Sequence, residues 1–179
     1  MKFTETPMEG LLLIEPQRFA DDRGTFMEAF NLRLFRNHGI QHDFVQDNES
    51  ISKKNVIRGL HFQVAPNEQG KLVRVLQGRA MDVVLDLRKD SKTYGRSFSV
   101  ELTASASNML WIPPGFAHGF EALEEDTIFF YKVTNYYHKA AEAGIRFDDP
   151  EINIQWKTTQ PIVSEKDRLL PTLREWSAM

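Results

Sequence analysis

The sequence predicts a mainly β protein, a two-sheet barrel with short helices at its periphery. Short segments rich in β-branched and aromatic residues alternate with turn residues along most of the 179-residue chain, at the spacing of strands in a sandwich or barrel. Strands do not alternate regularly with helical segments, which argues against a doubly wound parallel sheet. The length suits one compact domain, so we expect residues 1–179 to form a single domain.

Several segments have the length and composition of strands, and each ends close to residues that favour turns. In chain order these are residues 25–30, 44–52, 56–63, 71–77, 80–87, 97–102, 108–112 and 127–135. Alternation with a period of two is clearest in residues 82–87 and 129–134. Because successive side chains of a strand point to opposite faces, each of these strands is expected to pack one face on the core and to present a different face opposite.

Helical signals are few. Asn31 is suited to cap a helix over residues 32–38, and Gly39 is suited to end it. A second short helix is expected over residues 139–143, ending at Gly144.

The composition excludes several classes of protein. Lys and Arg total 22 and Asp and Glu total 25, a net charge of −3, which excludes a globally basic nucleic-acid binder and an acidic disordered tail. The chain has no cysteine, so a disulfide scaffold, a thiolate metal site and a thiol nucleophile are excluded. Its longest uncharged stretch, residues 102–120, is interrupted by a Pro-Pro pair and cannot span a membrane as one helix, and the N-terminus lacks a signal peptide. We expect a cytoplasmic protein with neither a nucleic-acid nor a membrane partner.

The segment Arg58-Gly59-Leu60-His61 places an arginine, a glycine and a histidine in an otherwise apolar strand. A strand with a satisfied histidine is the plain structural interpretation. Strict alternation would put Arg58 and His61 on opposite faces. A bulge at Gly59 would bring both to one pocket, because a glycine inside a strand often marks a bulge or a close backbone approach.

Residues 113–120 contain the spacing Pro-x-Gly-x-x-His, which ends at His118. As structure, this is a turn that swings the chain into a new strand, which explains the proline and glycine but not the histidine. The spacing also resembles one half of a cupin metal site, whose other half is a His-x-His pair followed by a glutamate. His61 is followed by Phe and Gln, so that pair is missing, and a metal normally needs three or more ligands. We therefore expect no metal.

The remaining candidates are weak when taken one by one. Tyr131 lies in a half-buried strand, and Ser164-Glu165-Lys166-Asp167 is expected to be a solvated turn unless a contact tethers it. The segment from Arg23 to Glu28 begins a strand, and Gln46-Asp47-Asn48 is a polar trio whose burial would demand partners. Together with Lys71, they predict a pocket that moves protons on an anionic organic substrate.

These motifs occur in the same order in dTDP-4-dehydrorhamnose 3,5-epimerases, the dTDP-sugar epimerase branch of the cupins, which the chain resembles from about Gly10 to Leu173. The resemblance is carried by Gln46-Asp47-Asn48, Arg58-Gly59-Leu60-His61, residues 113–120, Tyr131, Asp148-Asp149-Pro150 with Trp156, and Ser164-Glu165-Lys166-Asp167. It implies a cupin-type jelly-roll β-barrel without a cofactor, and a homodimer in which residues of about 1–30 contact the partner.

The implied activity is metal-free 3,5-epimerisation of dTDP-4-dehydro-6-deoxy-D-glucose to dTDP-4-dehydro-L-rhamnose. In the resemblance, His61 matches the proton acceptor, Tyr131 the proton donor, Asp167 the carboxylate that pairs with the histidine, and Lys71 the group near the C4 oxygen of the sugar. The implied substrate contacts are Arg23, Glu28, Gln46, Asp47, Asn48, Arg58, His118, Glu142 and Lys166. Tyr137 matches an aromatic that stacks on thymine, and Tyr136 is a rival for that position.

These residue types suit that chemistry. A hydrogen α to a ketone is a very weak acid, so the enolate must be stabilised as it forms, which a lysine ammonium near the C4 oxygen can do. Imidazole accepts protons near neutral pH, and a carboxylate on its far nitrogen fixes the tautomer. A tyrosine hydroxyl keeps its proton at neutral pH and can supply it from the opposite face of the ring. Because C3 and C5 flank the same carbonyl, one such site can serve both inversions.

The sequence leaves three alternatives open. The first is an epimerase that inverts one centre of a related nucleotide-linked 4-ketosugar. The second is a sugar-nucleotide binder without catalysis, and the third is a metal-dependent cupin oxygenase.

Overall fold

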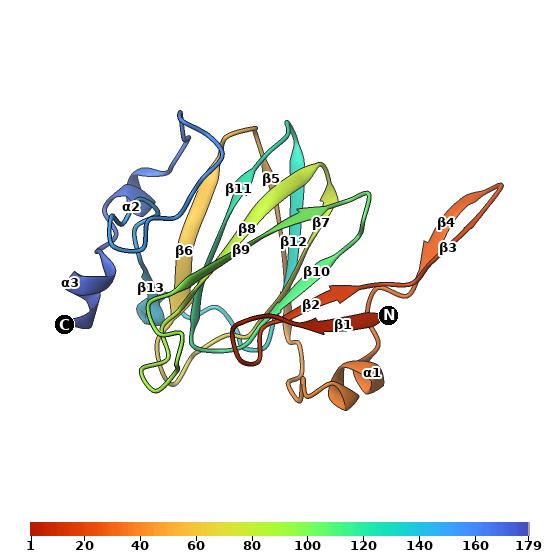
Figure 1. Cartoon of the computed structure of the whole chain (residues 1–179), viewed down its shortest axis with the longest axis horizontal. Helices are drawn as coiled ribbons and strands as arrows, with labels where there is room; N and C mark the ends of the chain where they lie inside the picture. Colours follow the sequence, from red (N-terminus) through yellow and green to blue (C-terminus); the bar gives the residue numbers. More distant parts are fainter. Residues whose placement is uncertain (179) are drawn as a thin grey trace.

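Two antiparallel sheets face each other and enclose the core (Figure 1). The computed structural model describes residues 1–178. The six-stranded sheet has the order β1 (Lys2–Glu5), β2 (Leu12–Glu15), β10 (Met109–Ile112), β7 (Lys71–Gln77), β12 (Thr127–Val133), β5 (Gln46–Ser52). The five-stranded sheet has the order β13 (Glu142–Gly144), β6 (Ile57–Gln63), β11 (Phe116–Ala122), β8 (Arg79–Asp86), β9 (Ser97–Thr103). The predicted mainly β, two-sheet barrel with short helices is confirmed.

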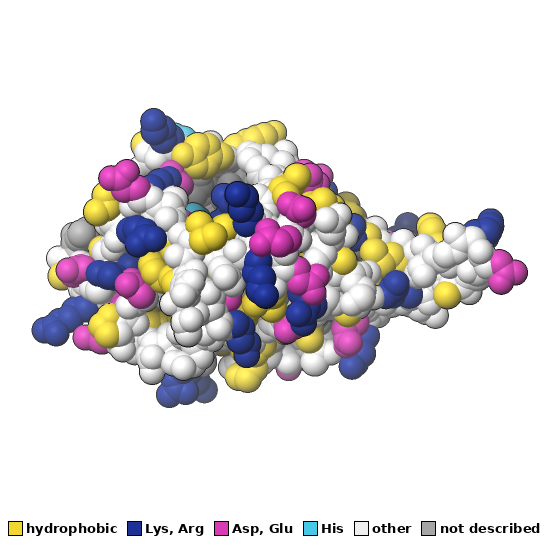
Figure 2. Space-filling view, turned by 90° about the horizontal axis from the view of Figure 1, so that it is seen from above, with side chains coloured by type: hydrophobic (Ala, Val, Ile, Leu, Met, Phe, Trp, Pro, Cys, Tyr) yellow, Lys and Arg dark blue, Asp and Glu magenta, His cyan; other side chains and the backbone are white. Residues whose placement is uncertain are grey.

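Strands β3 (Arg18–Asp21) and β4 (Gly24–Met27) pair only with each other, as a hairpin outside both sheets. The hairpin extends away from the barrel in Figure 1 and forms a narrow projection in Figure 2. Its aromatic side chains Phe19 and Phe26 are 54% and 72% exposed. An apolar element held out in solvent in this way is typical of a segment that contacts another molecule.

Helix α1 (Leu32–Asn37) begins where the sequence predicts. The side chain of Asn31 accepts a hydrogen bond from the backbone N–H of Leu34 at 3.1 Å, which caps the first turn. The prediction of the first helix is therefore confirmed.

The prediction of a second helix over residues 139–143 is wrong. A short 3₁₀ turn, η1 (Lys139–Ala141), leads directly into β13, which pairs along the edge of β6. Backbone hydrogen bonds to that sheet edge replace those that would continue the helix, a tertiary effect that local propensity does not contain.

Two further helices, α2 (Glu165–Arg168) and α3 (Leu173–Ser177), lie beside β6 and β13 along the edge of the five-stranded sheet (Figure 1). Ser164 caps α2, because its side chain accepts a hydrogen bond from the backbone N–H of Asp167. The expected solvated turn over residues 164–167 is thus a capped helical turn, and Asp167 is only 4% exposed.

The core is formed by the inward faces of the two sheets. Phe120 on β11 and Phe129 on β12 stack across the interior with ring centroids 4.0 Å apart and an interplanar angle of 2°. Val73, Leu110 and Val84 pack in the same buried cluster. These side chains form the apolar interior, and Phe120 and Phe129 extend to the cavity described below.

The surface carries acidic and basic side chains in mixture, as Figure 2 shows for one face. Within residues 1–178, no helix has the length and apolar character needed to cross a membrane.

Candidate active site

A cavity of about 490 Å³ opens at the end of the barrel between the two sheets. Its lining combines polar side chains from both sheets with the helical turn α2, namely Arg58, His61, Lys71, His118, Tyr131, Lys166 and Asp167. Phe120 and Phe129 form its apolar wall. A smaller cavity of about 160 Å³ shares His61, Lys71 and Tyr131 with it. The two together make a cleft with proton-transfer groups at the centre.

A β-bulge at Gly59 brings Arg58 and His61 to the same cavity. On β11, His118 pairs with His61 and Phe120 pairs with Arg58, so one residue of β11 faces two residues of β6. Gly59 has a φ of +117°, and an added Cβ would lie 2.7 Å from both the Cα of Gly119 and the carbonyl oxygen of His118. Only glycine fits this close approach, and the bulge predicted from the sequence is confirmed.

His61 forms a pair with Asp167. Its Nε2 lies 2.7 Å from Oδ1 of Asp167, and the other carboxylate oxygen accepts the backbone N–H of Gly59 at 3.2 Å. Burial alone would raise the pKa of Asp167, but hydrogen bonds from His61 and the backbone hold that pKa below its usual value. The ionised carboxylate therefore keeps the ring proton on Nε2, and Nδ1, which has no partner within residues 1–178, keeps a lone pair that can accept a proton.

Lys71 begins β7 and reaches across to the opposite sheet, where its Nζ donates to the carbonyl oxygen of His61 at 3.2 Å. Burial lowers the pKa of Lys71 to about 8, against the opposing effect of the Asp82 and Glu142 charges. The side chain therefore remains mostly protonated at pH 7. A buried ammonium beside the base is placed to stabilise negative charge on a substrate oxygen.

Tyr131 projects into the cavity from β12. Burial raises the pKa of Tyr131, with a smaller opposing effect from the Arg58 charge. The hydroxyl thus keeps its proton at neutral pH and can act as an acid.

A second histidine–aspartate pair lies beside the first. Nε2 of His118 is 2.7 Å from Oδ1 of Asp82, and both side chains are buried. Burial lowers the pKa of His118, with the Asp82 charge acting in the opposite direction. His118 is therefore a neutral imidazole at pH 7.

The rim of the cleft is held by a chain of polar contacts. The Tyr137 hydroxyl donates to Oε2 of Glu142 at 2.9 Å, and Nζ of Lys166 lies 2.6 Å from Oε1 of the same carboxylate. Gln46 joins this rim through its Oε1, which accepts the backbone N–H of Tyr137, and through its amide, which donates to Asn48. Of the two rival aromatics, Tyr137 lines the cleft, whereas Tyr136 is not among its lining residues and is 66% exposed.

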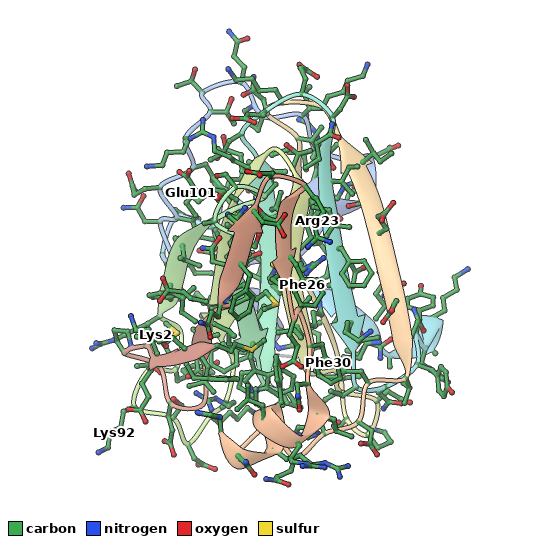
Figure 3. The ribbon with its side chains drawn as sticks, turned by 90° about the vertical axis from the view of Figure 1, so that its right-hand side faces the viewer. Lys2, Arg23, Phe26, Phe30, Lys92 and Glu101 are labelled. Atoms are coloured by element: carbon green, nitrogen blue, oxygen red, sulfur yellow. The ribbon has the colours of Figure 1, made fainter. Side chains whose placement is uncertain are left out.

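Three predicted contact residues lie apart from this cleft. Arg23 is on the projecting hairpin, paired with Asp21, and Glu28 follows that hairpin and accepts a hydrogen bond from Asn31 (Figure 3). Asp47 lies between two cleft residues in β5, so alternation turns it outward, where it pairs with Lys132 at 2.7 Å. Asp47 therefore does not line this chain's cleft, and its role as a substrate contact stays a prediction.

Comparison with known proteins agrees with this geometry. The sequence profile of the family described as dTDP-4-dehydrorhamnose 3,5-epimerase matches residues 5–175, nearly the whole chain. The chain belongs to this family. The resemblance stated from sequence motifs, and with it the assignment as an isomerase, is confirmed.

Relatives in the epimerase family match the chain over most of its length. The dTDP-4-dehydrorhamnose 3,5-epimerase of Methanothermobacter thermautotrophicus is 48% identical over 97% of this chain and 95% of its own. The crystal structure of the Bacillus anthracis enzyme, with TDP and PPi bound, is 46% identical with a TM-score of 0.94 and covers 96% of this chain and 99% of that one. A Legionella pneumophila 3,5-epimerase in complex with dTDP-4-keto-L-rhamnose is 41% identical with a TM-score of 0.93, over 97% and 93% of the two chains. These structures confirm the jelly-roll fold.

Sequence reasoning missed two polar residues at the epimerase-family site. Ser50 lines the cavity, and its buried hydroxyl has no hydrogen-bond partner in the described part of the chain. Asp82 lies behind the cavity wall, paired with His118. A carboxylate inside the apolar run 80–87 was the available signal for Asp82, whereas Ser50 has no signal of its own in the sequence. Among residues 1–178, no group of three or more His, Asp or Glu side chains is arranged to hold a metal ion.

Proposed function

We propose that the chain inverts C3 and C5 of dTDP-4-dehydro-6-deoxy-D-glucose by removing and returning the protons α to the C4 ketone. The observation that carries this proposal is the convergence of His61, Lys71 and Tyr131 on one cavity, with Asp167 behind the histidine. A base, a fixed cation and an acid are the groups that enolate chemistry needs.

In the first step, Nδ1 of His61 takes the proton from carbon. Asp167 holds the opposite nitrogen at 2.7 Å, so it orients the ring and stabilises the imidazolium that forms. The electron pair left on carbon moves to the C4 oxygen, and the Lys71 ammonium stabilises the resulting enolate.

In the second step, the enolate carbon must be protonated on the other face of the ring. Tyr131 supplies this proton, because it lies on β12 in the sheet opposite β6, which carries His61. Its raised pKa keeps the proton in place until the enolate is formed. The same groups act on C3 and on C5 when the sugar shifts within the cleft, since both carbons adjoin the C4 carbonyl.

The nucleotide binds along the rim. Base–aromatic stacking is worth about 1–3 kcal/mol in other proteins, and Tyr137 offers such a surface beside Glu142. Arg58 and Lys166 face the cavity with the positive charge that a diphosphate requires. The ligands named for the Bacillus anthracis and Legionella pneumophila structures are TDP with PPi and dTDP-4-keto-L-rhamnose. TDP and dTDP-4-keto-L-rhamnose carry the same nucleoside diphosphate as the proposed substrate.

We infer that the working protein is a homodimer whose hairpin completes the partner's site. Arg23 and Glu28 match substrate-contact positions but lie on or next to the projecting hairpin and do not line the cavities of their own chain. The exposed Phe19 and Phe26 give that hairpin an apolar surface for a second copy.

Complementation between inactive variants tests this arrangement. Arg23→Ala leaves the cavity intact and His61→Ala leaves the hairpin intact. A mixture of the two should recover roughly a quarter of wild-type activity through exchanged dimers if Arg23 acts on the partner's site. Recovery of nothing would place Arg23 in its own chain's site, and full activity of Arg23→Ala by itself would place Arg23 outside catalysis.

The activity itself is tested by incubating the protein with dTDP-4-dehydro-6-deoxy-D-glucose and determining the product stereochemistry by proton NMR. Inversion at both C3 and C5 supports the proposal. A related structure, titled as a 3′-monoepimerase from Streptomyces bikiniensis, has a TM-score of 0.91 and 30% identity, so inversion at C3 alone would select the single-centre alternative. Tight binding without any turnover would select the non-catalytic binder.

A further inference from the structure

Two histidine–aspartate pairs lie side by side in the cleft. His61 and His118 are direct partners across the β6–β11 pairing, and each has its Nε2 2.7 Å from a carboxylate oxygen. They differ in exposure, since the His61 side chain is 33% exposed and that of His118 only 7%. The chemistry proposed above uses the first pair and gives the carboxylate of the second, Asp82, no role.

The surroundings of Asp82 do not stabilise its buried carboxylate, so a purely structural role does not explain this residue. It is completely buried on β8, between Ala80 and Val84 of the apolar core. One oxygen accepts the His118 bond, while the other has no partner within residues 1–178. A buried carboxylate that is only half hydrogen-bonded destabilises the fold.

Asp86 offers a direct contrast, because it is equally buried on the same strand. Its carboxylate accepts hydrogen bonds from Arg88, Ser91 and Thr93, with lengths between 2.6 and 3.0 Å. Both oxygens of Asp86 are thus fully hydrogen-bonded, as expected for a buried carboxylate with a structural role. Asp82 differs in facing the cleft groups and in keeping an oxygen unpaired.

We propose that Asp82 is a positioning residue for the epimerisation: it fixes His118 as the neutral tautomer with its proton on Nε2, and its charge keeps Lys71 an ammonium in the closed cleft. This deepens the proposed function and rests on it. With Nε2 donating to Asp82, Nδ1 of His118 has no partner within the described residues and can accept a hydrogen bond from a sugar hydroxyl.

The charge effect of Asp82 acts on Lys71 through the dry interior. The titratable and charged groups around Lys71 are Arg58 and His61 on β6, Asp82 on β8, His118 on β11, Tyr131 on β12, Glu142 on β13, Lys166 and Asp167 on α2, and Tyr137 at the rim. Three carboxylates lie among these groups: Glu142 is paired with Lys166 at 2.6 Å, Asp167 with His61 at 2.7 Å, and Asp82 with His118 at 2.7 Å. Glu142 is paired with a cation and both oxygens of Asp167 are hydrogen-bonded, whereas Asp82 keeps one oxygen without a partner within residues 1–178, so its charge is the least offset of the three.

The variant Asp82→Asn separates charge from geometry. The amide oxygen can still accept the His118 hydrogen bond, so the tautomer is kept while the charge is removed. The alkaline limb of the kcat–pH profile should then move down by about one pH unit, because an opposite charge nearby raises a lysine pKa by about that much. Asp86→Asn is the matched control: it should lower the melting temperature and leave the pH profile of the folded protein unchanged. An unchanged limb in Asp82→Asn would overturn the charge role.

Nitrogen-15 NMR of the unmodified protein provides a measurement that does not depend on folding of a variant or on activity. At pH 7, His118 should carry its proton on Nε2 alone. A proton on Nδ1 of His118 would overturn the proposal. If that signal is as expected but no epimerisation is detected, the proposed function fails while this assignment of the tautomer remains.

Discussion

Replacing Asp167 with asparagine should abolish most of the activity by moving one proton on His61. The backbone N–H of Gly59 donates to one Asp167 oxygen at 3.2 Å, while the other oxygen faces Nε2 of His61 at 2.7 Å. In Asp167→Asn, the amide oxygen must remain over the Gly59 N–H, because an NH₂ group there would face another donor. The NH₂ group then faces Nε2 and drives the ring proton to Nδ1, the nitrogen that must act as base.

The size of the loss follows from that tautomer change. The corresponding Asp→Asn change in a serine-protease triad lowers kcat about 10⁴-fold, and here we expect a loss of about 10³–10⁴-fold. Such a loss corresponds to about 4–5.5 kcal/mol in the activation barrier. The assay is kcat for product formation at pH 7, measured by proton NMR with saturating substrate.

A buried aspartate outside the site controls for general damage. Asp149 is 2% exposed, and its two oxygens accept the backbone N–H groups of Glu151 and Leu173. Asp149→Asn should lower the free energy of unfolding by about 1–3 kcal/mol and leave kcat of the folded protein near normal. A loss of less than tenfold in Asp167→Asn, or an equal loss in both variants, would refute the tautomer reasoning.

Three further results are expected. Tyr131→Phe should retain removal of the substrate proton but reduce inversion at least 100-fold, since the base remains and the acid is lost; deuterium wash-in without a change of stereochemistry identifies this case, and normal inversion would contradict it. kcat should fall as the pH rises through about 8, because Lys71 then loses the charge that stabilises the enolate; a pH–rate profile checks this, and a flat profile to pH 10 would exclude the role. Gly59→Ala should lower the free energy of unfolding by about 3 kcal/mol or more, since the new Cβ would meet backbone atoms at 2.7 Å. Gly24→Ala, also at positive φ but in open space, should lower it by only about 1 kcal/mol. Thermal unfolding compares the two variants, and similar losses would contradict the steric argument.

The parts of the fold that could be predicted from sequence depend on local chemistry. Alternation located β7, β8 and β12 closely, and a single asparagine marked the start of α1. The bulge at Gly59 could be predicted because a glycine between Arg58 and His61 is the only way for both to share a face.

What could not be predicted depends on contacts made far along the chain. The turn at residues 164–167 is polar enough to be solvated, and contacts with Gly59 and His61, more than 100 residues earlier, bury Asp167. The edge strand β13 forms because β6 offers it unpaired backbone groups, although its own residues favour helix. The outward direction of Asp47 follows from simple alternation along β5, and a motif match taken residue by residue overlooked it.

The most direct test of the central claim is deuterium exchange between solvent and substrate. In deuterium oxide, the unmodified protein should introduce label at both C3 and C5 of dTDP-4-dehydro-6-deoxy-D-glucose, and His61→Ala should introduce none while still binding the nucleotide. Label appearing at the same rate with His61→Ala, or no label with the unmodified protein, would contradict the account of His61 as the base.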